Sequence, residues 1–365
     1  MGVITIIKIL KDIQITNDFI SDVIKNNSYN EKIINYYHRL QKEDEISMSN
    51  KIKSIEECNQ IWILDKYEEQ KVKDFKKTNL CKDKFCNNCK KVKQASRMTQ
   101  FIPILDELEK EYDLFHVVLT VPNLEEHDCF KLSAKIKKMF DSYRKLNHYL
   151  LNIKKIRDVD FTKYGYIGSL RSLEISYQNN NYHPHLHCIF VLKKGLKLTK
   201  KYKNVFSKSR KNGLRKFSEL EILIQKIWYL TNNDIKVTKK SIQDLELGYS
   251  CMIDKVEQQH YFEVFKYMTK SNSDENEFIT YDNFKVLYYA LKNVRQIQGY
   301  GILYNIKEDL NLENIVDNFY NAVIEELQKK ENPLECLETP EEVLNNNSNY
   351  IVISRKKIFS YLRTL

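Results

Sequence analysis

The sequence lacks any apolar run that approaches the roughly 18 to 20 residues of a membrane-spanning helix. The apolar residues 1–10 have no basic n-region and no small-residue cleavage site before or after them, so a secretory signal is not expected. A length of 365 residues excludes a disulfide-built mini-protein and favours two or three compact units. The sequence therefore predicts a cytoplasmic protein with packed cores and no membrane partner.

Acidic residues are fewer than basic ones, 49 against 59, and the imbalance is uneven along the chain. Residues 193–216 contain eleven basic residues and no acidic one, whereas residues 308–342 contain eleven acidic residues and two lysines. Solvated surface is the ordinary explanation of such runs. A polyanionic partner is the alternative, because Lys and Arg that neutralise phosphates release counterions. Charge alone favours nucleic acid only slightly.

Four of the eight cysteines are grouped. Cys81, Cys86 and Cys89 form the pattern CKDKFCNNC, and Cys58 lies 23 residues before it. In a reducing compartment this grouping predicts thiolate ligation of a structural Zn²⁺ rather than disulfide pairing. Cys58 is the ligand that the spacing supports least, and His38 or a scattered cysteine is the alternative fourth ligand. Free core cysteines are the alternative to a metal site.

Apolar periodicity predicts an α+β fold with a central antiparallel sheet and flanking helices. The segment FHVVLTVPN is typical of a buried strand that stops at a proline, and residues 129–151 have the spacing of an amphipathic helix. The runs GSLRSLEISY and LHCIFVL flank the polar segment QNNN and predict a hairpin. Further helices are predicted over 219–230, 257–270 and 286–297, and a further strand over 234–239.

These patterns divide the chain into four parts. We expect a segment of unknown role at 1–45, a zinc-binding module at 46–98, the main domain at 99–308 and an acidic helical tail at 309–365. The tail is a candidate for self-association, so a homo-oligomer is one expectation.

Three of the eight histidines lie within the five residues HPHLH, directly before an apolar strand. On a strand, His185 and His187 project to the same face, where two imidazoles form half of a divalent metal site. Glu174 on the preceding strand comes opposite the pair across the predicted hairpin and is the candidate third ligand. A hydrogen-bonded structural role is the alternative for these histidines. His183 is expected only to flank the site, because Pro184 follows it.

HPHLH followed by an apolar strand resembles the HUH motif of the HUH endonucleases, specifically of the initiators of rolling-circle plasmid replication in bacteria. CKDKFCNNC resembles the zinc-binding region of one branch of these initiators, VVLTVPN the strand before the histidines, and YFEVFKYMTK the motif that holds the nucleophilic tyrosine. ALKNVRQIQGYG resembles the usual sequel of that motif. The resemblance covers about residues 55–305 and implies a metal-dependent, site-specific DNA nickase and strand transferase, with an HUH nickase domain at 99–308.

The helix predicted around residue 265 has two distinct faces. Tyr261 and Phe265 belong to its apolar stripe, whereas Glu263 and Tyr267 share another face because they are four residues apart. An ordinary surface tyrosine is the alternative for Tyr267. The resemblance implies that Tyr267 is the nucleophile, that Glu263 is a general base at termination, and that Lys266 supplies positive charge near the phosphate; solvated surface is the alternative for Lys266.

The resemblance also implies the chemistry and the partners. Attack by Tyr267 would leave a 5′-phosphotyrosine link and a free 3′-OH that primes synthesis, and strand transfer would later rejoin the DNA. His185, His187 and Glu174 would hold Mg²⁺ or Mn²⁺. The partners would be single-stranded or hairpin origin DNA, a host helicase and a host DNA polymerase.

The basic segment 193–216 is a candidate DNA-binding surface, with a flexible basic loop as the alternative. Its length and the acidic tail depart from the family pattern, which leaves DNA specificity and oligomeric state open. The candidate DNA-binding residues are Lys200, Lys201, Lys203, Lys208, Arg210, Lys211, Arg215 and Lys216.

Two other functions stay open at this point. A mobilisation relaxase or HUH transposase would use the same chemistry, and a zinc-stabilised regulator would bind DNA without cleaving it. The cysteine pattern together with the E-x-x-K-Y arrangement favours the initiator.

Overall fold

The computed structural model describes residues 17–58, 61–66, 72–78, 80–178, 181–203, 215–265, 269–271, 279–306 and 350–354. They belong to two compact units. The first contains the described residues up to Thr99 together with 350–354, and the second contains those from Gln100 onward to residue 306. None of the helices in the described part of the chain is long and apolar enough to cross a bilayer.

The first unit combines helices with a small antiparallel sheet. The N-terminal part of helix α4 (Asn87–Glu111) also belongs to it. Its strand order is β11-β1-β2. The C-terminal tail thus contributes a strand, which the sequence patterns did not predict, while the helix predicted within the tail lies outside the described residues. The other elements are α2 (Asn17–Glu43), α3 (Ser49–Glu56), β1 (Ile61–Lys66), β2 (Val72–Thr78) and β11 (Tyr350–Ser354).

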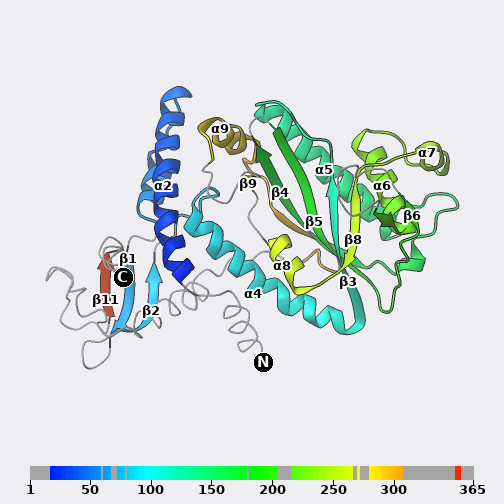
Figure 1. Cartoon of the computed structure of the whole chain (residues 1–365), viewed down its shortest axis with the longest axis horizontal. Helices are drawn as coiled ribbons and strands as arrows, with labels where there is room; N and C mark the ends of the chain where they lie inside the picture. The colour runs from blue at the N-terminus through cyan, green and yellow to red at the C-terminus, as the bar shows by residue number, and fades with distance from the viewer. Residues whose placement is uncertain are drawn as a thin grey trace. The chain divides into compact units, whose positions relative to one another are not determined.

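The second unit is built on a six-stranded sheet (Figure 1). Five strands follow the antiparallel order β10-β4-β5-β3-β8, and β9 pairs parallel to β4. This confirms the predicted α+β fold and the predicted hairpin, which is β4-β5. The strands are β3 (Tyr112–Thr120), β4 (Gly168–Gln178), β5 (Asn181–Lys193), β8 (Cys251–Lys255), β9 (Thr269–Ser271) and β10 (Ile297–Gly301).

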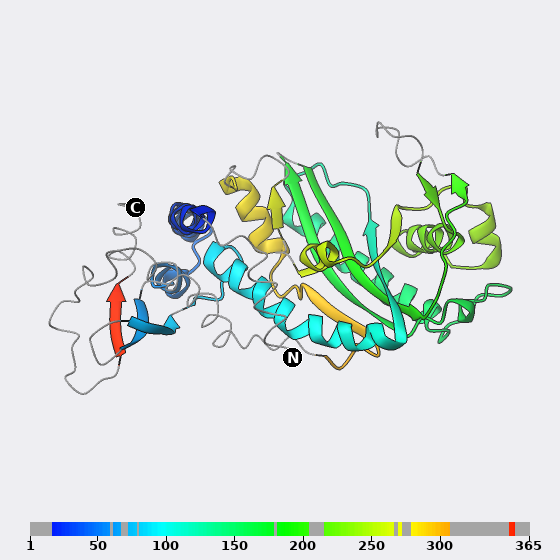
Figure 2. The same ribbon diagram turned by 60° about the horizontal axis from the view of Figure 1, so that its bottom comes forward.

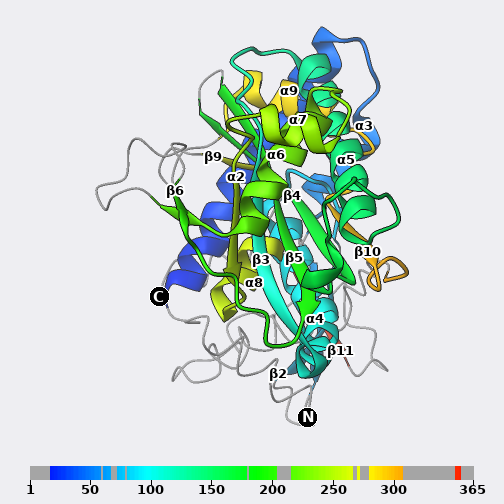
Figure 3. The same ribbon diagram turned by 90° about the vertical axis from the view of Figure 1, so that its right-hand side faces the viewer.

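The two faces of this sheet are covered by different helices. Helix α5 (Cys129–Leu150) packs on one face, where the Tyr143 hydroxyl lies 2.7 Å from Oγ of Ser169. Side chains alternate along β4, so Glu174 projects from the opposite face. That opposite face is covered by helix α8 (Gln258–Phe265); Figure 2 shows α8 in yellow-green in front of the strands, and Figure 3 shows α5 and α8 on either side of them.

The remaining elements of the second unit lie around the sheet. Helix α6 begins with a capping box between Ser218 and Glu221, and its buried Trp228 donates from Nε1 to the carbonyl oxygen of Thr120 at 2.7 Å. This bond ties α6 to the end of β3. The elements are η1 (Thr162–Tyr164), the β6-β7 hairpin (Tyr202–Lys203 and Lys216–Phe217), α6 (Glu219–Asn232), α7 (Lys239–Asp244) and α9 (Tyr281–Ala290).

One prediction of secondary structure was wrong, and two predicted helices have other bounds than expected. The predicted strand 234–239 leads into α7, because Thr238 and Ser241 form a capping box there. The helix predicted over 257–270 ends at Phe265 in the described residues and is followed by β9. The helix predicted over 286–297 ends at Ala290, and β10 begins at its last residue. The two helices were predicted too far toward the C-terminus because β9 and β10 both pair with the same edge of β4. Local periodicity does not reveal this pairing.

Candidate metal centre and active site

The three predicted ligands of the divalent cation lie together on the face of the sheet that α8 covers. The β4-β5 register places Glu174 directly opposite His185. Oε2 of Glu174 lies 3.4 Å from Nε2 of His185 and 2.9 Å from Nε2 of His187. One ligand atom from each residue lies within 4.8 Å of the other two, so a single cation can be reached by all three. A carboxylate and two imidazoles form a donor set that can hold a divalent cation.

Each imidazole is oriented through its second ring nitrogen. Nδ1 of His185 lies 3.0 Å from the backbone oxygen of His183, and Nδ1 of His187 lies 3.1 Å from Nε2 of His116. A carbonyl oxygen only accepts hydrogen bonds, so the geometry assigns the proton of neutral His185 to Nδ1. In that neutral tautomer Nε2 carries the lone pair that metal ligation requires, whereas the protonated imidazole would donate its Nε2–H to Glu174.

The electrostatics of the site keep the carboxyl group ionised. Glu174 is 5% exposed, and burial by itself would raise its pKa. The hydrogen bonds and charges of His185 and His187 outweigh burial and hold the pKa of Glu174 well below its usual value of 4.5. The carboxylate is thus available as an anionic ligand at neutral pH.

Helix α8 brings a further set of polar groups over this face. Its His260 ring stacks on His116 of β3, with the ring centroids 4.6 Å apart. Glu263, the predicted general base, lies one turn further along and is half-buried. The helix is anchored by Phe265, which stacks on Phe101 of α4 with centroids 5.5 Å apart. The apolar stripe predicted for this helix therefore packs inward, as its spacing indicates.

The predicted nucleophile Tyr267 and the neighbouring Lys266 lie outside the described residues. The described chain resumes at Thr269, which is the register partner of Ile175 on β4. Ile175 directly follows Glu174, so the chain after the predicted nucleophile runs along the strand that carries the candidate ligand.

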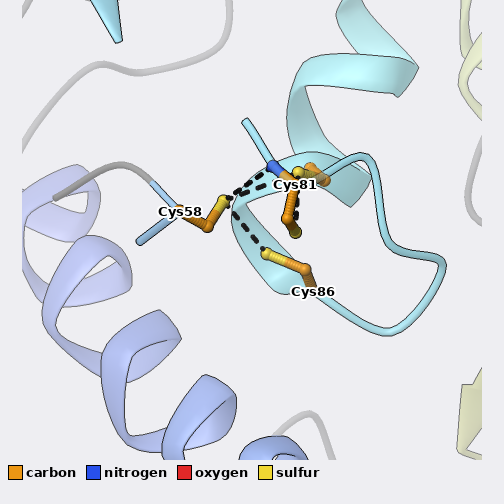
Figure 4. A group of neighbouring side chains, drawn as sticks. Cys58, Cys81 and Cys86 are labelled. Carbon is orange, nitrogen blue, oxygen red and sulfur yellow. Dashed lines mark hydrogen bonds between the residues drawn. The ribbon is translucent and has the colours of Figure 1, made fainter. Parts of the chain in front are cut away.

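The four grouped cysteines also converge, in the first unit. Figure 4 labels three of them, Cys58, Cys81 and Cys86. The Sγ atom of Cys58 lies 3.6 Å from that of Cys86 and 3.7 Å from that of Cys89, and Cys81 and Cys89 are 3.5 Å apart. Zn–S bonds of about 2.3 Å in a tetrahedron separate the sulfurs by about 3.8 Å, so the spacing suits Zn²⁺. Cys58 is the fourth member, and the alternative His38 is not in the cluster.

Hydrogen bonds within the cysteine cluster favour one thiolate, because they lower the pKa of Cys86 and raise the pKa of Cys81 and Cys89. Hydrogen bonds from the thiols of Cys58, Cys81 and Cys89 hold the pKa of Cys86 well below its usual value. The Asn30 amide donates to Cys86 Sγ at 3.3 Å. Such N–H···S contacts stabilise thiolates, which are the form that binds zinc.

Comparison with known proteins decides the family. Residues 72–350 match the family model Rep_1, which describes a replication protein. The chain belongs to the replication protein family. It is 26% identical over 273 residues to "Protein rep" of Lactiplantibacillus plantarum (73% of this chain, 77% of that protein). It is 26% identical over 244 residues to "Protein rep" of Bacillus amyloliquefaciens (64% and 65%), and 27% identical over 249 residues to "Protein rep" of a Bacillus species (66% and 74%). No solved structure matches the chain. The resemblance to rolling-circle plasmid initiators is confirmed.

Two of the predicted DNA-binding residues of this replication protein are engaged within the fold. Lys200 Nζ lies 2.6 Å from Oδ1 of Asp254, and Arg215 lies 2.9 Å from Oδ2 of the same carboxylate. Both cations also approach the fully buried Glu221, at 3.6 and 3.7 Å. Ion pairs of this kind tie the ends of the basic segment to β8 and α6.

Of the other six predicted DNA-binding residues, the structure describes three. The side chains of Lys201 and Lys216 are exposed. Lys203 is placed as part of β6. Lys208, Arg210 and Lys211 lie outside the described residues.

His116 is the residue beside the candidate ligands that the sequence patterns missed. His116 interrupts the apolar run FHVVLTVPN, and this was the available signal. It lies on the same face as Val118, the register partner of His187, because side chains alternate along β3. Its place beside the ligand follows from the β3-β5 register, which local sequence does not specify.

Proposed function

We propose that this replication protein is a metal-dependent nickase that cuts single-stranded origin DNA of a plasmid through attack by Tyr267 and later rejoins the strand. The observation that carries the proposal is the cluster of Glu174, His185 and His187 on the sheet face covered by α8, the helix that precedes Tyr267. A replication protein whose candidate cation site lies under the helix that precedes Tyr267 in the sequence has the parts that nicking requires.

The proposed reaction exchanges one phosphodiester for another. The phenolic oxygen of Tyr267 bonds to phosphorus and its proton passes to solvent or a base, while the bond from phosphorus to the 3′ oxygen breaks and that oxygen takes up a proton. The product is a 5′-phosphotyrosine link with a free 3′-OH, which primes rolling-circle synthesis. A bound Mg²⁺ or Mn²⁺ would supply polarisation of the scissile phosphate. Because the phosphotyrosine link replaces one phosphodiester with another, attack by a 3′-OH on the link can rejoin the strand without an external energy source.

Two residues near Tyr267 have proposed supporting roles. Glu263 acts as the general base at termination, where it activates the attacking group. Lys266 supplies positive charge to the phosphate. Tyr261 is an unsuitable rival nucleophile, since it lies in the core and burial raises its pKa.

The proposed substrate is single-stranded or hairpin origin DNA, contacted by the basic segment 193–216. A duplex does not present its phosphate in the splayed geometry that attack requires. The proposed partners are a host helicase and DNA polymerase in the cytoplasm, with self-association through the tail, and the zinc ion has a structural role.

The test is formation of a covalent adduct between the full chain and labelled origin-bearing single-stranded DNA in the presence of Mn²⁺. Tyr267→Phe should abolish the adduct, whereas Tyr261→Phe, a matched change on the same segment, should retain it. An adduct that survives Tyr267→Phe would place the nucleophile elsewhere. DNA binding without any cleavage by the wild type would instead support a non-catalytic regulator.

A further inference from the structure

Three imidazoles from three separate elements form a contiguous row beside the candidate cation site. They are His187 of β5, His116 of β3 and His260 of α8. His187 and His116 are buried, at 7% exposure each. Only His187 belongs to the ligand cluster, so the other two have no role in the proposed chemistry.

The contact between His116 and His187 is a hydrogen bond in the plane of the rings. Their planes differ by 7° and their centroids are 5.3 Å apart, while Nε2 of His116 lies 3.1 Å from Nδ1 of His187. Two coplanar imidazoles whose facing nitrogens are 3.1 Å apart have centroids a little over 5 Å apart, as observed. Rings stacked face to face would have closer centroids. The lone pair of one nitrogen is therefore aimed at the N–H of the other.

The contact of His116 with His260 is of a different kind. The centroids are 4.6 Å apart and the planes differ by 26°, which is face-to-face stacking. His260 accepts the backbone N–H of Glu257 at its own Nδ1, at 2.9 Å, and so caps the start of α8. His260 thus covers the ring of His116.

We infer that His116 is a positioning residue for the metal ligand His187. In the metal-bound protein Nε2 of His187 is occupied by the cation, so its proton is on Nδ1 and is donated to Nε2 of His116. His116 must then carry its own proton on Nδ1. It does for His187 what the backbone oxygen of His183 does for His185, and together the two acceptors hold both Nε2 atoms toward Glu174.

The inference rests on the proposed function, because it requires that Glu174, His185 and His187 bind a cation. It goes beyond that function by assigning the orientation of one ligand to a residue on another strand. Partners of this kind typically change metal affinity by 10- to 100-fold when they are removed.

The first test measures Mn²⁺ affinity of the full chain by the spectroscopic signal of free Mn²⁺, with the melting temperature recorded in parallel. His116→Phe retains the ring that stacks on His260 but has no acceptor, and should weaken Mn²⁺ binding about 10- to 100-fold. His116→Gln places an amide oxygen near the position of Nε2 and should restore most of the affinity. His260→Phe, the matched control, retains the stacking and should leave affinity within about twofold of the wild type.

Unchanged Mn²⁺ affinity in folded His116→Phe would overturn the inference, as would an equal loss in His116→Gln. A second measurement needs no variant of His116: the ring nitrogen shifts of wild-type protein loaded with Mg²⁺ should show His116 protonated on Nδ1 alone. Protonation on Nε2 would overturn it. The proposed function has a separate control, since His185→Ala must weaken Mn²⁺ binding; affinity that is insensitive to His185→Ala would refute the cation site itself.

Discussion

Nε2 of His187 lies 2.9 Å from Oε2 of Glu174, although the two residues are on different strands and are not register partners. Glu174 pairs with His185, and His187 pairs with Ser172, so the close contact runs diagonally across the hairpin. One carboxylate thus reaches both imidazoles from a single position on β4, and three donors converge without any contribution from a loop.

The first prediction concerns this carboxylate. Glu174→Gln retains the shape of the side chain but removes its charge, and should weaken Mn²⁺ binding at least tenfold, or by about 1.4 kcal/mol. Ser176→Ala, a change on the same face of the same strand, should leave the affinity unchanged. Titration of both variants with Mn²⁺ measures the difference, and equal affinities would show that Glu174 is not a ligand.

The second prediction concerns the cysteine cluster. Wild-type protein should contain about one zinc ion per chain, and Cys86→Ser should lose most of it, because a structural site needs its fourth thiolate. Its melting temperature should fall as well, since metal binding contributes to folding. Cys129→Ser, which changes a cysteine outside the cluster, should retain the zinc. Metal analysis of the purified proteins measures the zinc content per chain. Equal zinc contents in wild type and Cys86→Ser would contradict the zinc site.

The third prediction is a pH dependence of stability at Asp254. Burial would raise the pKa of this carboxyl, but hydrogen bonds from Lys200 and Arg215 lower it below its usual value of 3.8. A carboxyl whose folded-state pKa is depressed contributes stability above its unfolded value and loses it as pH falls through the folded value. Asp254 is half-exposed, so the contribution is modest, about 0.5 to 1 kcal/mol.

Asp254→Asn should therefore lower the melting temperature by a constant amount above pH 4 to 5. The difference in melting temperature between wild type and variant should become smaller as the pH falls below 3.8. Thermal denaturation of both proteins across this range measures it. A difference in melting temperature that grows on acidification would refute the ion pairs of Asp254 with Lys200 and Arg215.

The fourth prediction separates the lysines that remain available to DNA from those that are engaged. Lys201 and Lys216 are exposed, so replacing either with Ala should reduce the dependence of log affinity on log salt by about 0.7 for single-stranded DNA. Lys155→Ala, an exposed control in another segment, should leave this slope unchanged. Binding measured at several salt concentrations provides the slopes, and equal slopes for Lys201→Ala and wild type would exclude that lysine as a phosphate contact.

Much of the candidate site could be predicted because its signals are local. Alternation along a strand places His185 and His187 on one face, and a short hairpin makes its two strands neighbours, which brings Glu174 opposite them. The spacing of Cys81, Cys86 and Cys89 likewise reports a compact knuckle.

The same local patterns failed where a strand depends on a distant edge. The ends of two predicted helices, 269–270 and residue 297, instead belong to strands that pair with β4. Apolar periodicity over so few residues fits a helix and a strand about equally, and only the available hydrogen-bonding edge decides between them. The pairing of β11 with β1 is an extreme case, because the β-branched run YIVIS fits a strand but does not specify a partner almost 300 residues earlier.

The residues by themselves determined the α+β class, the cysteine cluster and the Glu-His-His set, since each depends on spacing within a strand, a hairpin or a knuckle. Tertiary structure alone decided that His116 and His260 adjoin the cation site and that Lys200 and Arg215 pair with Asp254. The physical reason is that these contacts join elements far apart in the chain, and the packing of whole strands and helices, rather than any short pattern, determines which of them meet.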